Sequence, residues 1–281
     1  MFKKLFILVI LLQFSCKTKD LRTLADLPSI LKEVSGTEVI ENSNTLWMVN
    51  DSGNKPILYG LDRKGNIKKE LKIQAKNNDW EDLTSDNEGN IYIGDFGNND
   101  NKRKNLTILK VQAKDLNSES KVAIEKISFY YPEQNKFPPK KSNRHFDCEA
   151  FFFYKDSLYL FTKSRDKRDF GKTNLYKIPA KEGNHEAKFI SSLTTCNESH
   201  CWITSADIGS DGKKVVLLSS KSVWLFTDFE KDDFLSGRLK EYSLGFISQK
   251  ESISFKDSTS VYITDERKSG TGGKLYEFPL N

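Results

Sequence analysis

The sequence of 281 residues lacks the features that mark several common protein classes. It has only 7 prolines, 4 cysteines and 3 histidines, and no long stretch has a helical hydrophobic period. The 44 Lys+Arg and 39 Asp+Glu residues are interspersed, and the net charge is only +5. No basic face of the kind that nucleic-acid-binding proteins present is therefore indicated. These absences argue against a helical fold and against nucleic acid as a partner.

Common catalytic motifs are missing as well. The sequence contains no G-x-S-x-G, P-loop, H-E-x-x-H or EF-hand pattern, and its histidines do not cluster near acidic residues. Hydrophobic residues nevertheless make up 37% of the chain and aromatic residues 12%. This content suffices for a sizeable core and excludes disorder for most of the chain.

The only long apolar run lies at the start of the chain. Leu5 to Leu12 follow the positive residues Lys3 and Lys4, and the segment ends in Ser15-Cys16. The run is too short to cross a bilayer, which needs about 20 apolar residues. It is typical of a secretory signal, and a small residue before cysteine is typical of a lipoprotein signal. Cleavage by an ordinary signal peptidase is the alternative.

These features predict the organisation of the chain. We expect a signal peptide over residues 1–15, a lipidated Cys16, a short tether over 16–20 and a single domain over 21–281. The location would be the cell envelope, with the protein facing the periplasm or the cell surface. We expect a monomer whose only contact with the membrane is its anchor.

The remaining cysteines suit an oxidising compartment. Cys196 and Cys201 are close enough in sequence to close a short disulfide loop, and Cys148, beside an apolar run, is predicted to be a buried thiol. A zinc site from Cys196, His200 and Cys201 is the alternative, but no second ligand pair accompanies it.

A pattern repeats along the chain. Each copy has a small or acidic start, a short strand, a polar turn, an apolar strand, and then an aliphatic-aromatic strand such as Leu175-Tyr176. The polar residue that ends the second strand follows the start of the copy by 14 positions in three copies, and by 15 and 16 positions in the other two. Short strands rich in Val, Ile, Tyr, Phe and Trp between polar turns indicate an all-β protein. The copies start at Ser35, Glu81, Glu149, Ser205 and Glu251.

Repeats of this length with three or four strands predict a β-propeller. The last copy ends without a fourth strand, so we expect Leu21–Leu31 to supply it and close the ring. We count five four-stranded blades. A sixth would require the long second interval to hide a degenerate repeat; we read its insertion, Glu133 to Arg144, as an exposed loop. The fourth strands of the other copies are predicted at Ile67–Ile73, Ile127–Tyr131, Ala187–Leu193 and Leu239–Leu244.

Four motifs carry a resemblance to known proteins: Asn50–Pro56, Asp79–Asp82, Gly94–Asn99 and Phe146–Ala150. Through these motifs the chain resembles a family of lipid-anchored bacterial β-propellers. It is more distantly similar to the calcium-dependent six-bladed propellers of the phytase-like, gluconolactonase-like and strictosidine-synthase-like groups. The resemblance implies a propeller fold and draws attention to acidic residues near the axis.

The first strand of each blade faces the channel, so the blade starts should converge there. Carboxylates that meet in a narrow channel must be protonated, paired with a base, hydrogen-bonded to backbone amides, or neutralised by a cation. Oxygen ligands alone favour Ca²⁺ over zinc. We therefore take as candidate metal ligands Glu81, Glu149, Glu251 and Asp95. Hydrogen bonding that ties one blade to the next, and direct acid/base catalysis, remain alternatives.

Other residues near the channel are candidate ligand contacts. They are Trp80, whose ring could stack on a sugar-like ligand, with Asp51, Lys163, Arg165 and Asp265. Lys163 and Arg165 are also candidates for simple pairing with the acids. His145 is either an acid/base partner of Glu149 or a loop histidine with no role.

Two functions of different class fit this sequence. The first is a lipid-anchored module that binds a small molecule or a protein through an acidic, calcium-binding channel. The second is a metal-dependent hydrolase of a phosphoester, ester or lactone, in which the channel acids hold the metal and position water.

Overall fold

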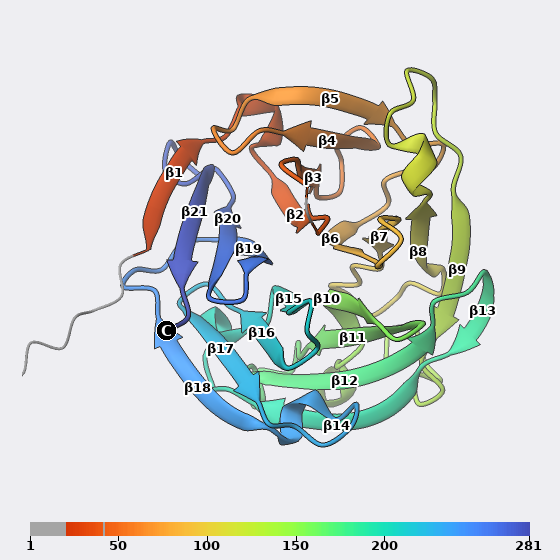
Figure 1. The fold of residues 1–281 in the computed structure, drawn as a ribbon. Helices are drawn as coiled ribbons and strands as arrows, with labels where there is room; N and C mark the ends of the chain where they lie inside the picture. Colours follow the sequence, from red (N-terminus) through yellow and green to blue (C-terminus); the bar gives the residue numbers. More distant parts are fainter. Residues whose placement is uncertain (1–20, 42) are drawn as a thin grey trace, which may run out of the picture.

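The computed structural model describes residues 21–41 and 43–281. The predicted signal peptide, the Cys16 anchor and the tether lie outside the described residues. The described chain folds into five blades arranged in a ring around a central axis (Figure 1). The all-β, five-bladed prediction is confirmed, and no sixth blade is present among the described residues.

Each blade is an antiparallel sheet whose first strand lies nearest the axis, as the alternation of apolar strands and polar turns predicts. Blade 1 contains β2 (Val34–Val39), β3 (Leu46–Asn50), β4 (Ile57–Leu61) and β5 (Ile67–Lys72). Blade 2 contains β6 (Trp80–Ser85), β7 (Ile91–Asp95), β8 (Leu106–Val111) and β9 (Glu125–Tyr130). Blade 3 contains β10 (Asp147–Tyr154), β11 (Ser157–Lys163), β12 (Lys172–Pro179) and β14 (Lys188–Thr194).

Blade 4 contains β15 (Ser205–Ile208), β16 (Lys214–Leu218), β17 (Ser222–Thr227) and β18 (Arg238–Ser243). Blade 5 contains β19 (Lys250–Asp257), β20 (Ser260–Asp265), β21 (Lys274–Pro279) and the N-terminal β1 (Arg22–Asp26). Strand β1 pairs antiparallel with β21, and Thr23 lies opposite Tyr276. The ring is thus closed by the first strand of the domain, as predicted.

The sequence did not predict one strand, β13 (Gly183–Glu186). It adds to the outer edge of blade 2 by parallel pairing with β9, so a segment of blade 3 is hydrogen-bonded to its neighbour. Within the described part of the chain, the helical structure is limited to five 3₁₀ turns: Ser29–Leu31, Ala113–Asp115, Lys141–Asn143, Ser199–Cys201 and Phe234–Ser236. No helix in residues 21–41 or 43–281 is long and apolar enough to cross a membrane.

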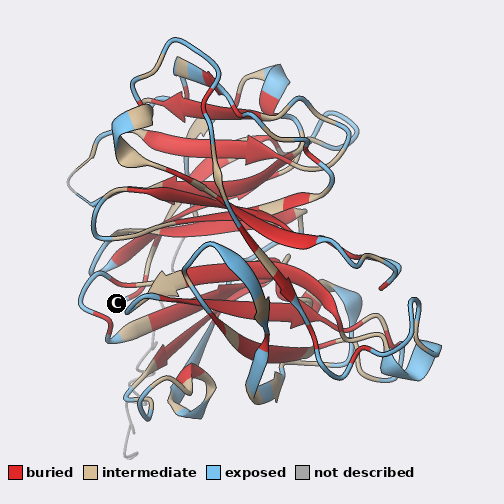
Figure 2. Cartoon of the chain, turned by 90° about the vertical axis from the view of Figure 1, so that its right-hand side faces the viewer, coloured by how far each residue is buried: buried red, intermediate tan, exposed pale blue. Residues whose placement is uncertain are grey.

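The hydrophobic core is divided into five parts, one between each pair of adjacent blades. Between blades 1 and 2, for example, Val49 and Leu58 pack with Trp80 and Ile91. Figure 2 shows buried strands throughout the ring and exposed residues mainly in the connections. Because every blade packs on two neighbours, the inner strands are held in a fixed arrangement around the axis.

At the crowded axis, the side chain of Asp82 binds several blades at once. Its carboxylate accepts hydrogen bonds from the Leu83 amide (2.9 Å) and from Ser205 Oγ (3.0 and 3.1 Å), and longer ones from the Phe151 and Ala206 amides (3.4 Å each). Blade 1 comes equally close, because a Cβ on Gly36 would lie 2.9 Å from the Asp82 carbonyl carbon. The blades therefore meet at small residues and shared hydrogen bonds.

Candidate functional site

Local irregularities in the inner strands direct the blade-start side chains. In four blades the pairing of the first strand with the second shifts by one residue at the blade start, between Val34 and Gly36, Trp80 and Leu83, Cys148 and Ala150, and Lys250 and Ser252. Such β-bulges leave a residue unpaired and re-aim its side chain. The residues at these shifts include Ser35, Glu81, Glu149 and Glu251, all of which line one cavity.

This cavity, which we call the channel mouth, lies at the end of the axis where the inner strands begin. Its volume is about 520 Å³, enough for a small ligand. Its walls are mostly polar and include seven of the connections between strands as well as the blade starts. The lining residues are Ser35, Asp51, Glu81, Asn99, Glu149, Lys163, Arg165, Ser199, His200, Trp202, Thr204, Ser220, Gln249, Glu251, Glu266 and Lys268.

One acid in the channel mouth is already neutralised. Glu149 Oε2 lies 2.7 Å from Lys163 Nζ, and Glu149 Oε1 lies 3.3 Å from an Arg165 nitrogen. Arg165 also pairs with Asp147, whose other oxygen accepts the Asn98 amide at 2.7 Å. Burial opposes the charge of Lys163, but the carboxylates of Glu149, Asp147 and Glu251 together outweigh it, and the pKa of Lys163 is raised. Lys163 and Arg165 thus pair with acids, the simpler of the two roles considered for them.

A second group of acids has no such partner. Asp51, Asp79 and Glu81, which we call the acid triad, each offer a carboxylate oxygen, and these oxygens lie within 4.8 Å of one another. Among residues 21–41 and 43–281, no Lys, Arg or His nitrogen lies within 4.0 Å of these carboxylates. The triad is therefore a group of three acids in a partly enclosed space with no base in direct contact.

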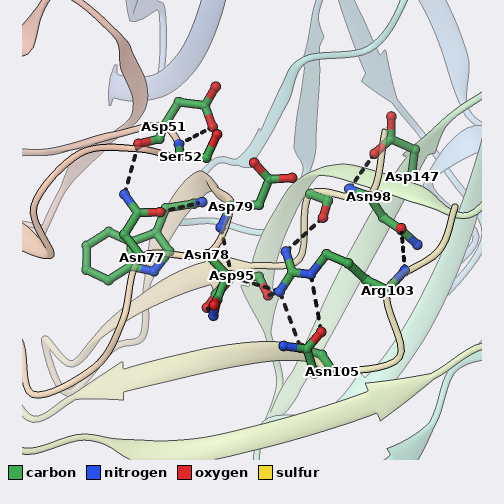
Figure 3. Close-up of polar contacts among 12 residues, drawn as sticks. Asp51, Ser52, Asn77, Asn78, Asp79, Asp95, Asn98, Arg103, Asn105 and Asp147 are labelled. Carbon is green, nitrogen blue, oxygen red and sulfur yellow. Dashed lines mark hydrogen bonds and ion pairs between the residues drawn. The ribbon is translucent and has the colours of Figure 1, made fainter. Parts of the chain in front are cut away.

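The backbone around the triad is held by asparagine side chains. Asn77 donates to the carbonyl oxygen of Asp51 at 2.9 Å (Figure 3). It also donates to the carbonyl oxygen of Asn50 at 3.0 Å, so it joins blade 1 to the start of blade 2. Asp79 is fixed by its own amide, which donates to Asp95 Oδ1 at 3.1 Å. The triad is thus built on a rigid framework.

Glycine at position 97 lets two of the triad carboxylates lie directly against the backbone. A Cβ at Gly97 would lie 2.0 Å from Glu81 Oε1 and 2.5 Å from Asp79 Oδ2. The loop after β7 therefore passes directly against both carboxylates, and only a residue without a side chain allows the approach.

The proximity of the acids is reflected in their proton affinities. Burial and then the Asp51 charge raise the pKa of Asp79 to about 6. Burial, followed by the Glu149 and Asp51 charges, raises the pKa of Glu81 well above its ordinary value. On the other wall, burial raises the pKa of Glu251 to about 7, and burial with the Glu251 charge raises that of Glu266 to about 8.

Three predicted site residues lie outside the channel mouth. Trp80 is fully buried between blades 1 and 2, so the expectation that its ring stacks on a ligand is wrong. Asp95 is buried and accepts hydrogen bonds from Asn78 (2.6 Å) and Arg103 (2.9 Å), which leaves it unavailable as a metal ligand (Figure 3). Asp265 is buried as well, and it accepts from Ser248 Oγ (2.8 Å), the Lys274 amide (3.0 Å) and the Tyr276 hydroxyl (3.0 Å).

The structure adds functional residues that the sequence analysis missed. Asp79 takes the place of Asp95 in the acidic group; it precedes Glu81 by two residues, and alternate residues near a strand share a side. Trp202 is the aromatic residue of the channel mouth, with Lys163 Nζ 5.2 Å and the Arg165 guanidinium carbon 4.9 Å from its ring centre. Trp202 lies in the irregular connection between β14 and β15. Such a segment has no periodic sequence pattern from which the position of a side chain could be predicted.

The predicted disulfide between Cys196 and Cys201 is confirmed, and Cys148 is a buried free thiol. His145 faces Ser164, with Nδ1 3.0 Å from Oγ, and is not among the residues that line the channel mouth. The structure therefore does not bring it to the site as a partner of Glu149.

The raised pKa values predict an unusual dependence of stability on pH. A buried acid that binds its proton more tightly in the folded state stabilises the fold at low pH, and this contribution is lost as pH rises through the folded-state pKa. With chelator present, we expect the melting temperature to fall by at least about 5 °C between pH 5 and pH 8. Differential scanning fluorimetry would measure it. Glu251→Gln should reduce this fall in melting temperature, and the exposed control Glu119→Gln should not. A melting temperature that stays constant or rises between pH 5 and pH 8 would contradict the raised pKa values of the buried acids.

Comparisons with known proteins agree on the fold. No protein-family model and no curated protein matches the sequence. Among solved structures, a gluconolactonase-like protein is similar over 94% of this chain and 92% of its own (TM-score 0.51, 9% identity). The PQQ-bound aldose sugar dehydrogenase of Streptomyces coelicolor is similar over 93% and 97% (TM-score 0.55, 11% identity). At these identities the similarities show the fold alone: the chain is a β-propeller distantly similar to gluconolactonase-like propellers, with five blades.

Proposed function

We propose that this protein is a binding module whose channel mouth holds a divalent cation at the acid triad, with a small, oxygen-rich ligand beside it. The observation that carries this proposal is the convergence of three carboxylates that have no basic partner. The neighbouring Glu149, in contrast, is paired with two basic side chains. Uncompensated like charges in a partly buried site are destabilising unless protons or a cation neutralise them.

The residues present fit Ca²⁺. This ion binds carboxylate and carbonyl oxygens at about 2.3–2.6 Å, so oxygens on opposite sides of it are about 5 Å apart. The triad oxygens lie within 4.8 Å of one another, so Asp51, Asp79 and Glu81 can reach one ion without movement of the backbone. Glu251 and Glu266, on the other wall, are available to a ligand.

Removing a triad carboxylate should weaken calcium binding and stabilise the calcium-free protein. We expect Asp51→Asn and Glu81→Gln to lower calcium affinity by at least about 10-fold, because carboxylates are the strongest ligands of this ion. In chelator, the same variants should melt at a higher temperature than the parent, because one of three buried acids that raise the cost of ionising one another is gone. Isothermal titration calorimetry and scanning fluorimetry would measure the two effects.

Two further variants sharpen this experiment. Gly97→Ala should lose calcium binding without any change of charge, because its methyl group would occupy the space against Glu81. Asp156→Asn, in an exposed turn at the opposite end of the blades, is the matched control and should bind as the parent does. Equal calcium affinity in the parent, Glu81→Gln and Gly97→Ala would refute the cation site.

A hydrolase is the second candidate, and one residue favours it. Glu251 is a carboxyl group in the cavity wall with a pKa of about 7, the range in which a general acid or base works best at neutral pH. In this role Glu251 would take a proton from water while Lys163 and Arg165 hold Glu149 in place on the other wall. A cation at the triad would supply polarisation of a carbonyl or phosphoryl oxygen.

A substrate panel separates the two candidates. Lactones, carboxylic esters and phosphomonoesters would be assayed with calcium and with chelator. The hydrolase predicts turnover that chelator abolishes and that Glu251→Gln lowers at least 100-fold or so, the usual contribution of a general acid or base. Absence of turnover from the calcium-loaded protein, with calcium binding intact, would leave the binding role alone.

We also propose that the protein is anchored in the cell envelope through a lipid on Cys16. The disulfide between Cys196 and Cys201 supports export, since disulfides persist in oxidising compartments. Expressed with its leader in a bacterial host, the parent should partition into detergent with the membranes, and Cys16→Ala should appear in the soluble fraction. Detergent partitioning of both proteins alike would contradict lipidation.

A further inference from the structure

The disulfide loop at the rim of the channel mouth carries chemistry that the proposed function does not use. Cys196 and Cys201 are separated by four residues, and both Glu198 and His200 lie between them. This loop joins the outer strand β14 of blade 3 to the inner strand β15 of blade 4. Ser199 and His200 line the channel mouth.

Four potential metal ligands are gathered in this loop. The two sulfur atoms and a carboxylate oxygen of Glu198 lie within 4.8 Å of one another. The Nε2 atom of His200 contacts Glu198 Oε2, so the imidazole adjoins the same group. Two thiolates, an imidazole and a carboxylate form a tetrahedral zinc set, and a spacing of two to four residues between cysteines is usual for zinc. The fourth ligand missing from the sequence pattern is thus supplied by Glu198.

The loop is held closed by contacts other than the disulfide. Thr195 Oγ1 is within hydrogen-bonding distance of the carbonyl oxygens of Gly171 (3.1 Å) and Cys201 (2.9 Å), and the Cys201 amide donates to the Glu198 carbonyl at 3.0 Å. The segment also packs tightly, since a Cβ on Gly171 would lie 1.8 Å from the Cys196 carbonyl oxygen. The ligands should therefore stay together when the sulfur–sulfur bond is broken.

We propose that this loop is a redox-controlled zinc site: the disulfide form binds no metal, and the dithiol form binds one Zn²⁺ through Cys196, Cys201, His200 and Glu198. A dithiol reductant supplies two electrons and two protons, which convert the disulfide into two thiols while the reductant becomes a disulfide. Zn²⁺ then binds as both thiols lose their protons to solvent. Reoxidation would expel the ion. The ion pair between Glu198 and Lys221, 3.8 Å apart, is exposed and weak enough to be displaced.

Cobalt substitution tests this proposal directly. The protein, reduced with a phosphine under anaerobic conditions, would be titrated with Co²⁺ and then with Zn²⁺. We expect one equivalent of Co²⁺ with thiolate-to-cobalt charge-transfer absorption and the strong visible bands of a tetrahedral ion, both removed by Zn²⁺. The oxidised protein should show neither. Co²⁺ at the carboxylates of the acid triad would give no thiolate band, so the two sites are distinguishable.

Variants assign the ligands. Cys196→Ser and Cys201→Ser should abolish the charge-transfer band. His200→Ala and Glu198→Gln should weaken Co²⁺ binding by more than about 10-fold, because loss of a residue that only supports a metal ligand already costs about that much affinity. Cys148→Ser, which removes the buried free thiol, and His185→Ala, in the edge strand β13, are the matched controls and should bind as the parent does. A reduced parent without a thiolate band, or a band that survives in Cys196→Ser, would overturn the proposal.

Discussion

The hydrogen bonds of Asp82 at the axis are the interaction on which the rest of this structure depends. One buried carboxylate accepts from blade 2 itself, from Phe151 in blade 3, and from Ser205 and Ala206 in blade 4. Ser205 Oγ in turn accepts the Ile253 amide of blade 5 at 3.0 Å. Because a buried acceptor without donors is costly, these bonds fix the distance of the inner strands from the axis, and that distance determines which side chains meet above them.

The channel mouth shows two ways of accommodating a carboxylate near a low-dielectric axis. Glu149 is paired with Lys163 and Arg165, which favour its charged form, although burial still raises its pKa. Asp51, Asp79 and Glu81 lack such basic partners. Burial raises the pKa of each, and the charges of neighbouring acids raise those of Asp79 and Glu81 further. The second arrangement costs stability in the free protein, and a site of this kind gains most from a ligand of positive charge.

The fold was predictable from the sequence because its signals are local and repeated. The blade starts, the polar turns and the strand that closes the ring all follow from strand periodicity, and the disulfide follows from the short spacing of its cysteines. The site was predictable only in part. Asp95 and Asp265 end equivalent strands, and Asp51 directly follows the corresponding strand of blade 1. Backbone and side-chain donors from nearby segments surround Asp95 and Asp265, and such donors leave no pattern in the sequence. Trp80 lies between two axial acids in the chain, yet strand alternation turns its ring into the core.

The most direct test of the central claim is a crystal structure of the protein grown with calcium, with anomalous diffraction used to locate the ion. We expect one calcium ion in the channel mouth, with carboxylate oxygens of Asp51, Asp79 and Glu81 about 2.3–2.6 Å from it. A channel mouth that contains only water at saturating calcium, with the three carboxylates still together, would contradict it.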